Sequence, residues 1–85
     1  MNLYVIKGIL QDYSSGCAII KAESILQARD FLESFLKEYG MDEQDVDEEI
    51  HYFNQSMKTN NYIEMVLDKK DSKAPGIIHL QWGGG

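Results

Sequence analysis

The chain has 85 residues, 44% of them hydrophobic and 11% aromatic, and its 14 acidic and 8 basic side chains give a formal net charge of −6. This composition predicts one small folded domain and excludes the disordered class. No apolar run approaches the ~20 residues that span a bilayer, no basic segment precedes an apolar one as in a secretory signal, and no Lys/Arg cluster favours direct binding of nucleic acid.

These exclusions, together with a single cysteine at Cys17 that permits no internal disulfide, predict a soluble, cytoplasmic and monomeric domain.

The first element along the chain is an apolar, β-prone run over residues 3–10. A turn-rich cluster follows over residues 11–16 and ends at Gly16, and residues 17–22 are again β-prone. Two such runs joined by a glycine-containing connection predict a β-hairpin.

The next segment predicts an amphipathic helix from Ser24 to Tyr39. Ser24 and Gln27 have the spacing of a capping box, in which each side chain satisfies a free backbone amide at the start of a helix. Gly40 is placed to end the helix in the left-handed region. One apolar stripe recurs at helical spacing, formed by Ile25, Ala28, Leu32, Phe35, Leu36 and Tyr39.

An acidic stretch follows the helix, with six carboxylates in eight residues: Asp42, Glu43, Asp45, Asp47, Glu48 and Glu49. One interpretation is a solvated connection that resists packing, with room for a single helical turn. The other is an acidic patch whose field attracts a basic partner surface. Residues 50–53 are β-prone and predict a short strand, and residues 57–61 have the composition of a loop.

Two further strands are predicted from alternating patterns. Residues 62–68 alternate so that Ile63, Met65 and Leu67 face the core, while Tyr62, Glu64 and Val66 face away. Residues 77–82 form the final strand, with Ile78, Leu80 and Trp82 on one face and His79 and Gln81 on the other. The outward residues suggest a partner surface formed by Tyr62, Val66 and His79.

Three consecutive glycines, Gly83, Gly84 and Gly85, come directly after this final strand. A free glycine-rich end can pass through a narrow enzyme channel, because glycine has no Cβ and adopts backbone angles that other residues avoid. The alternative is that the glycines are a frayed chain end or extra residues introduced by cloning. We expect residues 1–82 to form the domain and residues 83–85 to form a flexible tail.

The order of hairpin, helix and later strands predicts an α+β arrangement with a single helix against one face of a mixed sheet of four to five strands. An economical packing places the last strand beside the first and parallel to it. With its opening hairpin at residues 3–22, its helix at residues 24–39 and its glycine end, the chain resembles the ubiquitin-like β-grasp proteins, which include protein modifiers and small sulfur carriers. The resemblance lies in the order of elements over the whole chain.

The resemblance implies a function in which the chain is not itself an enzyme and needs no metal or cofactor. An ATP-dependent activating enzyme would adenylate the carboxylate of Gly85, and a conjugating or sulfur-transfer enzyme would follow. Gly84 and Gly83 would form the passage through the channel, and Trp82 would be the last anchored side chain. Whether the chain would be a modifier or a sulfur carrier stays open.

The alternative function belongs to a different class. A small acidic protein from a phage or mobile element can inhibit a partner by noncovalent binding, with carboxylates that mimic the phosphates of nucleic acid. The acidic stretch from Asp42 to Glu49 favours this hypothesis. The two functions differ in the part of the chain that matters, which is the glycine tail in one and the acidic stretch in the other.

Overall fold

The computed structural model describes residues 1–12, 14–67 and 74–83, in which four strands and two helices are formed. A hairpin of β1 (Asn2–Asp12) and β2 (Ser14–Ala22) comes first, as the sequence predicts. The helices α1 (Ile25–Tyr39) and α2 (Glu43–Lys58) follow, and then the strands β3 (Tyr62–Val66) and β4 (Gly76–Gln81). The predicted α+β class is confirmed.

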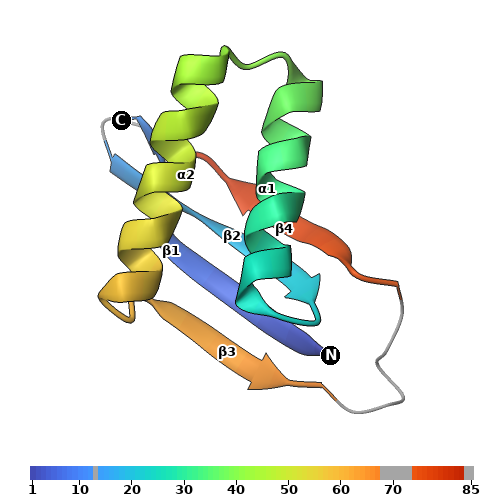
Figure 1. Cartoon of the computed structure of the whole chain (residues 1–85). Coiled ribbons are helices and arrows are strands. Elements are labelled where there is room, and N and C mark those ends of the chain that lie inside the picture. The colour runs from blue at the N-terminus through green and yellow to red at the C-terminus, as the bar shows by residue number, and fades with distance from the viewer. Residues whose placement is uncertain (13, 68–73, 84–85) are drawn as a thin grey trace.

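The strands form one sheet in the order β3-β1-β2-β4, and every neighbouring pair is antiparallel. Both helices lie side by side on one face of this sheet (Figure 1). Helix α1 packs over β2 and β4, and α2 packs over β1. The long hairpin therefore supplies the two central strands, and the later strands flank it on either side.

Two predictions about the sheet are wrong. The sheet is antiparallel rather than mixed, although its four strands in the described residues fall within the predicted four to five. The last strand, β4, pairs antiparallel with β2 and does not lie beside β1. The second helix explains this order. Because α1 and α2 cross the same face of the sheet in succession, the chain returns to the free edge of β1, where β3 pairs, for example Tyr62 with Ile6. The edge of β2 is then the one at which β4 pairs.

Helix α1 begins and ends where the sequence predicts. The Ser24 hydroxyl accepts a hydrogen bond from the Gln27 amide at 3.1 Å, and the Gln27 side chain accepts one from the Glu23 amide at 2.7 Å. The first bond is that of a capping box, whereas the Gln27 side chain bonds the amide of Glu23, one residue before the N-cap Ser24. Gly40 ends the helix with a φ of 97° in the left-handed region. Local chemistry is enough to fix this element.

Helix α2 contradicts the prediction of a single helix against the sheet. It also contradicts the predictions of a solvated connection, a strand at residues 50–53 and a loop from residue 57. A single helix runs from Glu43 to Lys58. Its inner side buries Val46, Phe53 and Ser56 and partly buries Ile50 and Met57. These apolar residues recur at helical spacing in the sequence, but the β-prone composition of residues 50–53 favoured the prediction of a strand. The early acids stabilise the helix because carboxylates interact favourably with the positive end of the helix dipole.

The core lies between the sheet and the helices. Its largest fully buried side chains include Ile6, Ile20, Leu32, Leu36 and Phe53. Neither of the two described helices covers the opposite face of the sheet (Figure 1). The two faces of the sheet therefore have different environments, which decides the orientation of the edge strands.

The facing of β3 is the reverse of the prediction. Tyr62 and Glu64 pair with Ile6 and Tyr4, so they lie on the helix side, while Ile63 and Met65 lie on the open face and are 46% and 47% exposed. Alternation shows that two faces differ, but it does not show which face is covered.

In β4, Leu80 pairs with Ala18 on the helix side and His79 pairs with Ile19 on the open face. The register shifts between Ile19, which pairs with His79, and Ile20, which pairs with Ile77. Ile78 therefore has no partner in the register and is 60% exposed. The predicted inward stripe is therefore kept by Leu80 and lost by Ile78.

Candidate functional site

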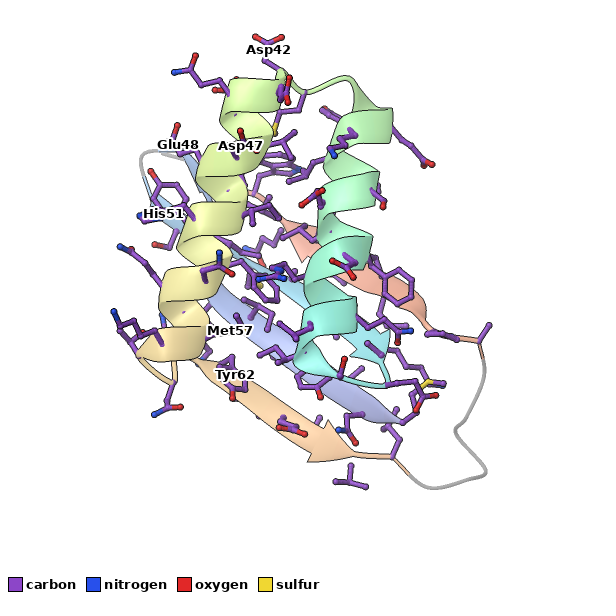
Figure 2. The ribbon with its side chains drawn as sticks, viewed as in Figure 1. Asp42, Asp47, Glu48, His51, Met57 and Tyr62 are labelled. Carbon is purple, nitrogen blue, oxygen red and sulfur yellow. The ribbon has the colours of Figure 1, made fainter. Side chains whose placement is uncertain are left out.

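Five exposed carboxylates of the acidic stretch lie at the end of α2 that joins α1, where Figure 2 labels Asp42, Asp47 and Glu48. We call this group the acidic surface and define it as Asp42, Glu43, Asp45, Asp47 and Glu48, all of which are exposed. The first turns of α2 fix their spacing, because residues three and four apart lie on one side of a helix. Asp42, Asp45 and Glu48 therefore share one side of α2, and Glu43 and Asp47 share another, from which their charges act on Lys37 of α1. The sequence predicted these residues as an acidic patch, and the structure shows that they lie on a helix.

Glu49, the sixth residue of the predicted acidic patch, does not belong to this surface. Its side chain is only 6% exposed, and its carboxylate accepts a hydrogen bond of 2.5 Å from the backbone amide of Leu10. Leu10 has a φ of 52°, which is rare for a residue with a branched side chain. Glu49 therefore holds an unusual conformation of β1, and its role is structural.

Electrostatic effects around the acidic surface extend to neighbouring side chains. Tyr52 donates a hydrogen bond of 2.6 Å to Glu48, and this bond raises the pKa of the Tyr52 phenol. The pKa of Lys37 on α1 is also raised, first by its hydrogen bond with Glu33 and further by the charges of α2 acids. The field of the acidic surface thus reaches α1.

An aromatic cluster borders the acidic surface and consists of Phe35, Tyr39 and Trp82. The rings of Phe35 and Tyr39 stack with centroids 6.1 Å apart, and those of Tyr39 and Trp82 are also 6.1 Å apart. Tyr39 is 68% exposed and Trp82 is 40% exposed. The sequence predicted Phe35 and Tyr39 in the core stripe, and only the packing shows that both lie near the surface, with Tyr39 between Phe35 and Trp82.

A cavity of about 200 Å³ lies where the aromatic cluster meets the acidic surface. It is lined by Met41, Asp45, Glu48, Glu49 and Trp82. Carboxylates attract a cation, and the face of an indole ring adds a cation–π interaction with an ammonium or guanidinium group. This arrangement suits the side chain of a lysine or arginine. The sequence did not predict Met41 as a residue of this site, because no motif or spacing pattern includes it.

The first of the three glycines lies within the folded part. Gly83 is buried, and its amide donates a hydrogen bond of 2.8 Å to the carbonyl of Leu10. The chain also passes so close to Gly16 that a Cβ there would lie 2.0 Å from the Gln81 carbonyl oxygen. Gly83 is therefore held against the hairpin, whereas Gly84 and Gly85 lie outside the described residues.

The predicted partner surface of Tyr62, Val66 and His79 is not brought together. Tyr62 and Val66 belong to β3 at one edge of the sheet, and His79 belongs to β4 at the other edge. The register also places Tyr62 and His79 on opposite faces, since Tyr62 pairs with Ile6 on the helix side and His79 pairs with Ile19 on the open face. Strand order, which the sequence does not specify, separates them.

No helix in the described ranges is both long and apolar enough to cross a membrane. Among the residues that the structure describes, no group of three His, Cys, Asp or Glu side chains could hold a metal ion. Comparisons of the chain with protein-family models, with curated proteins and with solved structures found no match.

Proposed function

We propose that this chain is a small noncovalent binding protein that holds a basic segment of a partner protein at the acidic surface. The observation that carries the proposal is the cavity in which Asp45 and Glu48 lie beside the half-exposed ring of Trp82. Aromatic side chains supply most of the binding energy in many interfaces, and clustered charges speed association. The net charge of −6 acts in the same direction.

The first testable prediction concerns Asp45 and Glu48. Changing both to lysine should weaken binding of a fluorescently labelled hexa-arginine peptide at least about tenfold, because attraction becomes repulsion next to the bound cation. Fluorescence polarisation at several salt concentrations measures the effect, and wild-type affinity should fall as salt rises. Trp82→Ala should weaken binding about fivefold through loss of the cation–π contact.

The matched control is Glu23→Lys with Asp30→Lys, which changes the net charge by the same amount. Both residues are exposed and do not line the cavity. If this control weakens peptide binding as much as the Asp45/Glu48 variant does, the attraction belongs to the total charge and the proposed site is wrong.

A second proposal is the ubiquitin-like carrier or modifier, with Gly85 as the activated residue. The run of three glycines supports it, and an antiparallel α+β sheet covered by helices is compatible with a β-grasp-like fold. The hydrogen bond from Gly83 to Leu10 weighs against it, because an activating enzyme would have to break this bond to draw in all three glycines. For this reason we rank it second.

The second prediction separates the two proposals. If the carrier function holds, N-terminally tagged protein in host lysate with ATP should form covalent adducts that a variant without Gly84 and Gly85 does not form. Intact-mass measurement detects such adducts, including a thiocarboxylate. If no adduct depends on these glycines while the peptide still binds, the noncovalent function stands alone.

A further inference from the structure

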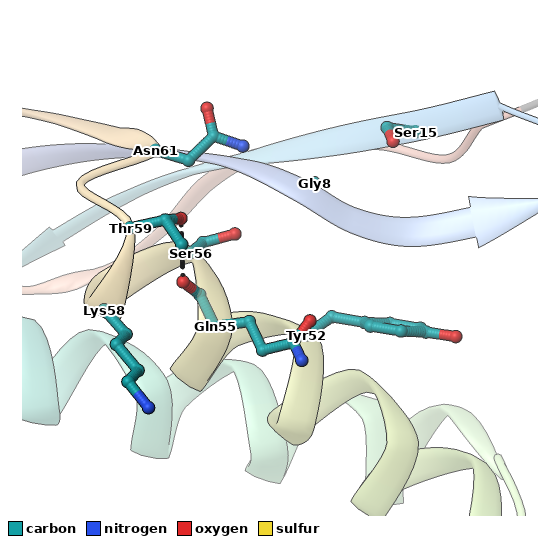
Figure 3. Close-up of a pocket in the computed structure, with 8 residues that line it drawn as sticks. All are labelled: Gly8, Ser15, Tyr52, Gln55, Ser56, Lys58, Thr59 and Asn61. Carbon is teal, nitrogen blue, oxygen red and sulfur yellow. Dashed lines mark hydrogen bonds between the residues drawn. The ribbon is translucent and has the colours of Figure 1, made fainter.

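A second cavity of about 580 Å³ lies between the hairpin and the last turns of α2. It shares no lining residue with the smaller cavity, although its Tyr52 is hydrogen-bonded to Glu48 of the acidic surface. Its volume is within the range of about 300–1,000 Å³ that is typical of small-molecule sites. Figure 3 shows the eight residues that line it. None of these eight is acidic, although the chain contains 14 acidic residues.

The lining offers neutral hydrogen-bonding groups from several directions. The hydroxyl of Ser56 donates to the carbonyl of Lys7, and the hydroxyl of Thr59 donates to the carbonyl of Gln55. Each oxygen can still accept a hydrogen bond from a ligand. The side-chain amides of Gln55 and Asn61 form no hydrogen bond within the described part of the chain, and each can both donate and accept.

Gly8 leaves room on the hairpin side of this cavity. Its φ is +76°, and a Cβ at this position would lie 3.1 Å from the Asn61 amide nitrogen and 3.2 Å from the Ser56 hydroxyl. A larger residue would therefore be strained and would crowd two polar groups of the lining. The bend of β1 at Gly8 thus shapes one wall of the cavity.

Tyr52 supplies the aromatic surface of the lining. Figure 3 shows its ring edge-on, across from Gly8 and Ser15, and its hydroxyl is bound to Glu48. The cationic lining residue, Lys58, extends away from Asn61 and Gly8 in the same view. A ligand with many neutral hydroxyl groups and one apolar face fits this arrangement better than an anion. The eight lining residues include no second ring that could sandwich a nucleobase.

We propose that this cavity binds a neutral monosaccharide. The amides of Gln55 and Asn61 and the hydroxyls of Ser56 and Thr59 bond the sugar hydroxyl groups. The ring of Tyr52 packs against the C–H face of the sugar. For about 12 non-hydrogen atoms, the usual efficiency of small ligands gives a dissociation constant on the order of 1 mM.

The third prediction is a titration of the whole ¹⁵N-labelled chain with glucose, galactose, mannose and N-acetylglucosamine, followed by NMR. At least one sugar should cause saturable shifts at the amides of Gly8, Gln55, Thr59 and Asn61. Gln55→Ala and Asn61→Ala should each raise the dissociation constant about fivefold, the effect of one lost hydrogen bond. Both residues are exposed, so these variants should fold normally.

The matched control is Gln44→Ala, because Gln44 is an exposed glutamine at the other end of α2 and should leave sugar binding unchanged. The proposal is overturned if no sugar causes saturable shifts up to about 20 times the expected dissociation constant. It is also overturned if glucose 6-phosphate binds more tightly than glucose, since the site would then recognise an anion.

Discussion

Gly16 and Gly40 are both glycines for a reason, but the reasons differ. At Gly16 the reason is space, since a Cβ would lie 2.0 Å from the Gln81 carbonyl oxygen and 2.8 Å from the Gly83 nitrogen. At Gly40 the reason is conformation, because φ is +97° and, apart from Gly40 and its two chain neighbours, no atom of the described residues lies within 4 Å of the position that a Cβ would occupy. A side chain is harder to accommodate at Gly16 than at Gly40, because the obstructing atoms at Gly16 belong to the backbone and cannot move as a side chain can.

The fourth prediction follows at the residue scale. Gly16→Ala should lower the free energy of unfolding by about 2–3 kcal/mol, because backbone atoms must move to admit the methyl group. Gly40→Ala should cost only about 1 kcal/mol, the strain of a left-handed alanine. Urea denaturation of both variants gives the comparison. Equal losses would show that β4 and Gly83 do not pass against Gly16 as described.

Helix α2 shows how one element combines two roles. Its outer side carries the acidic surface, and its inner side holds β1 through Glu49 and Ser56, which bond the backbone of Leu10 and Lys7. The carbonyl of Leu10 also accepts the Gly83 amide. The backbone of one residue in β1 thus connects α2 to the end of β4.

The fifth prediction separates these roles at the element scale. Glu49→Ala should lower the free energy of unfolding by about 1–3 kcal/mol, since it leaves the buried Leu10 amide without its acceptor. Asp47→Ala, two residues earlier and exposed, should change it by no more than about 0.5 kcal/mol. Thermal and urea unfolding measure both. Similar effects of the two changes would contradict a structural role of Glu49.

On the scale of the whole molecule, charge and apolar surface are distributed unevenly. The acidic surface and the aromatic cluster meet at the junction of α1, α2 and β4, whereas the proposed sugar cavity lies at the opposite end of α2. Ile63 and Met65, which were expected in the core, are half-exposed on the uncovered face of the sheet. The two proposed sites meet at the hydrogen bond between Tyr52 and Glu48, so changes at Asp45 and Trp82 test the acidic surface without removing a contact of the sugar cavity.

The sequence alone determined the features that depend on neighbouring residues. The hairpin, the N-cap of α1 at Ser24 and the end of α1 at Gly40 are local, because hydrogen bonds and backbone preferences over three or four residues set them. Five of the six clustered acids are exposed, as charged side chains usually are. These features needed no knowledge of the rest of the chain.

Only the tertiary structure decided the features that depend on distant residues. Residues 50–53 became helical because Val46 and Phe53 bury against β1 and outweigh the local β preference. The antiparallel sheet order separated Tyr62 from His79 and brought Trp82 to Tyr39. Burial and strand pairing join residues far apart in the chain, so no local pattern could assign Glu49 to Leu10 or place Gly83 within the fold.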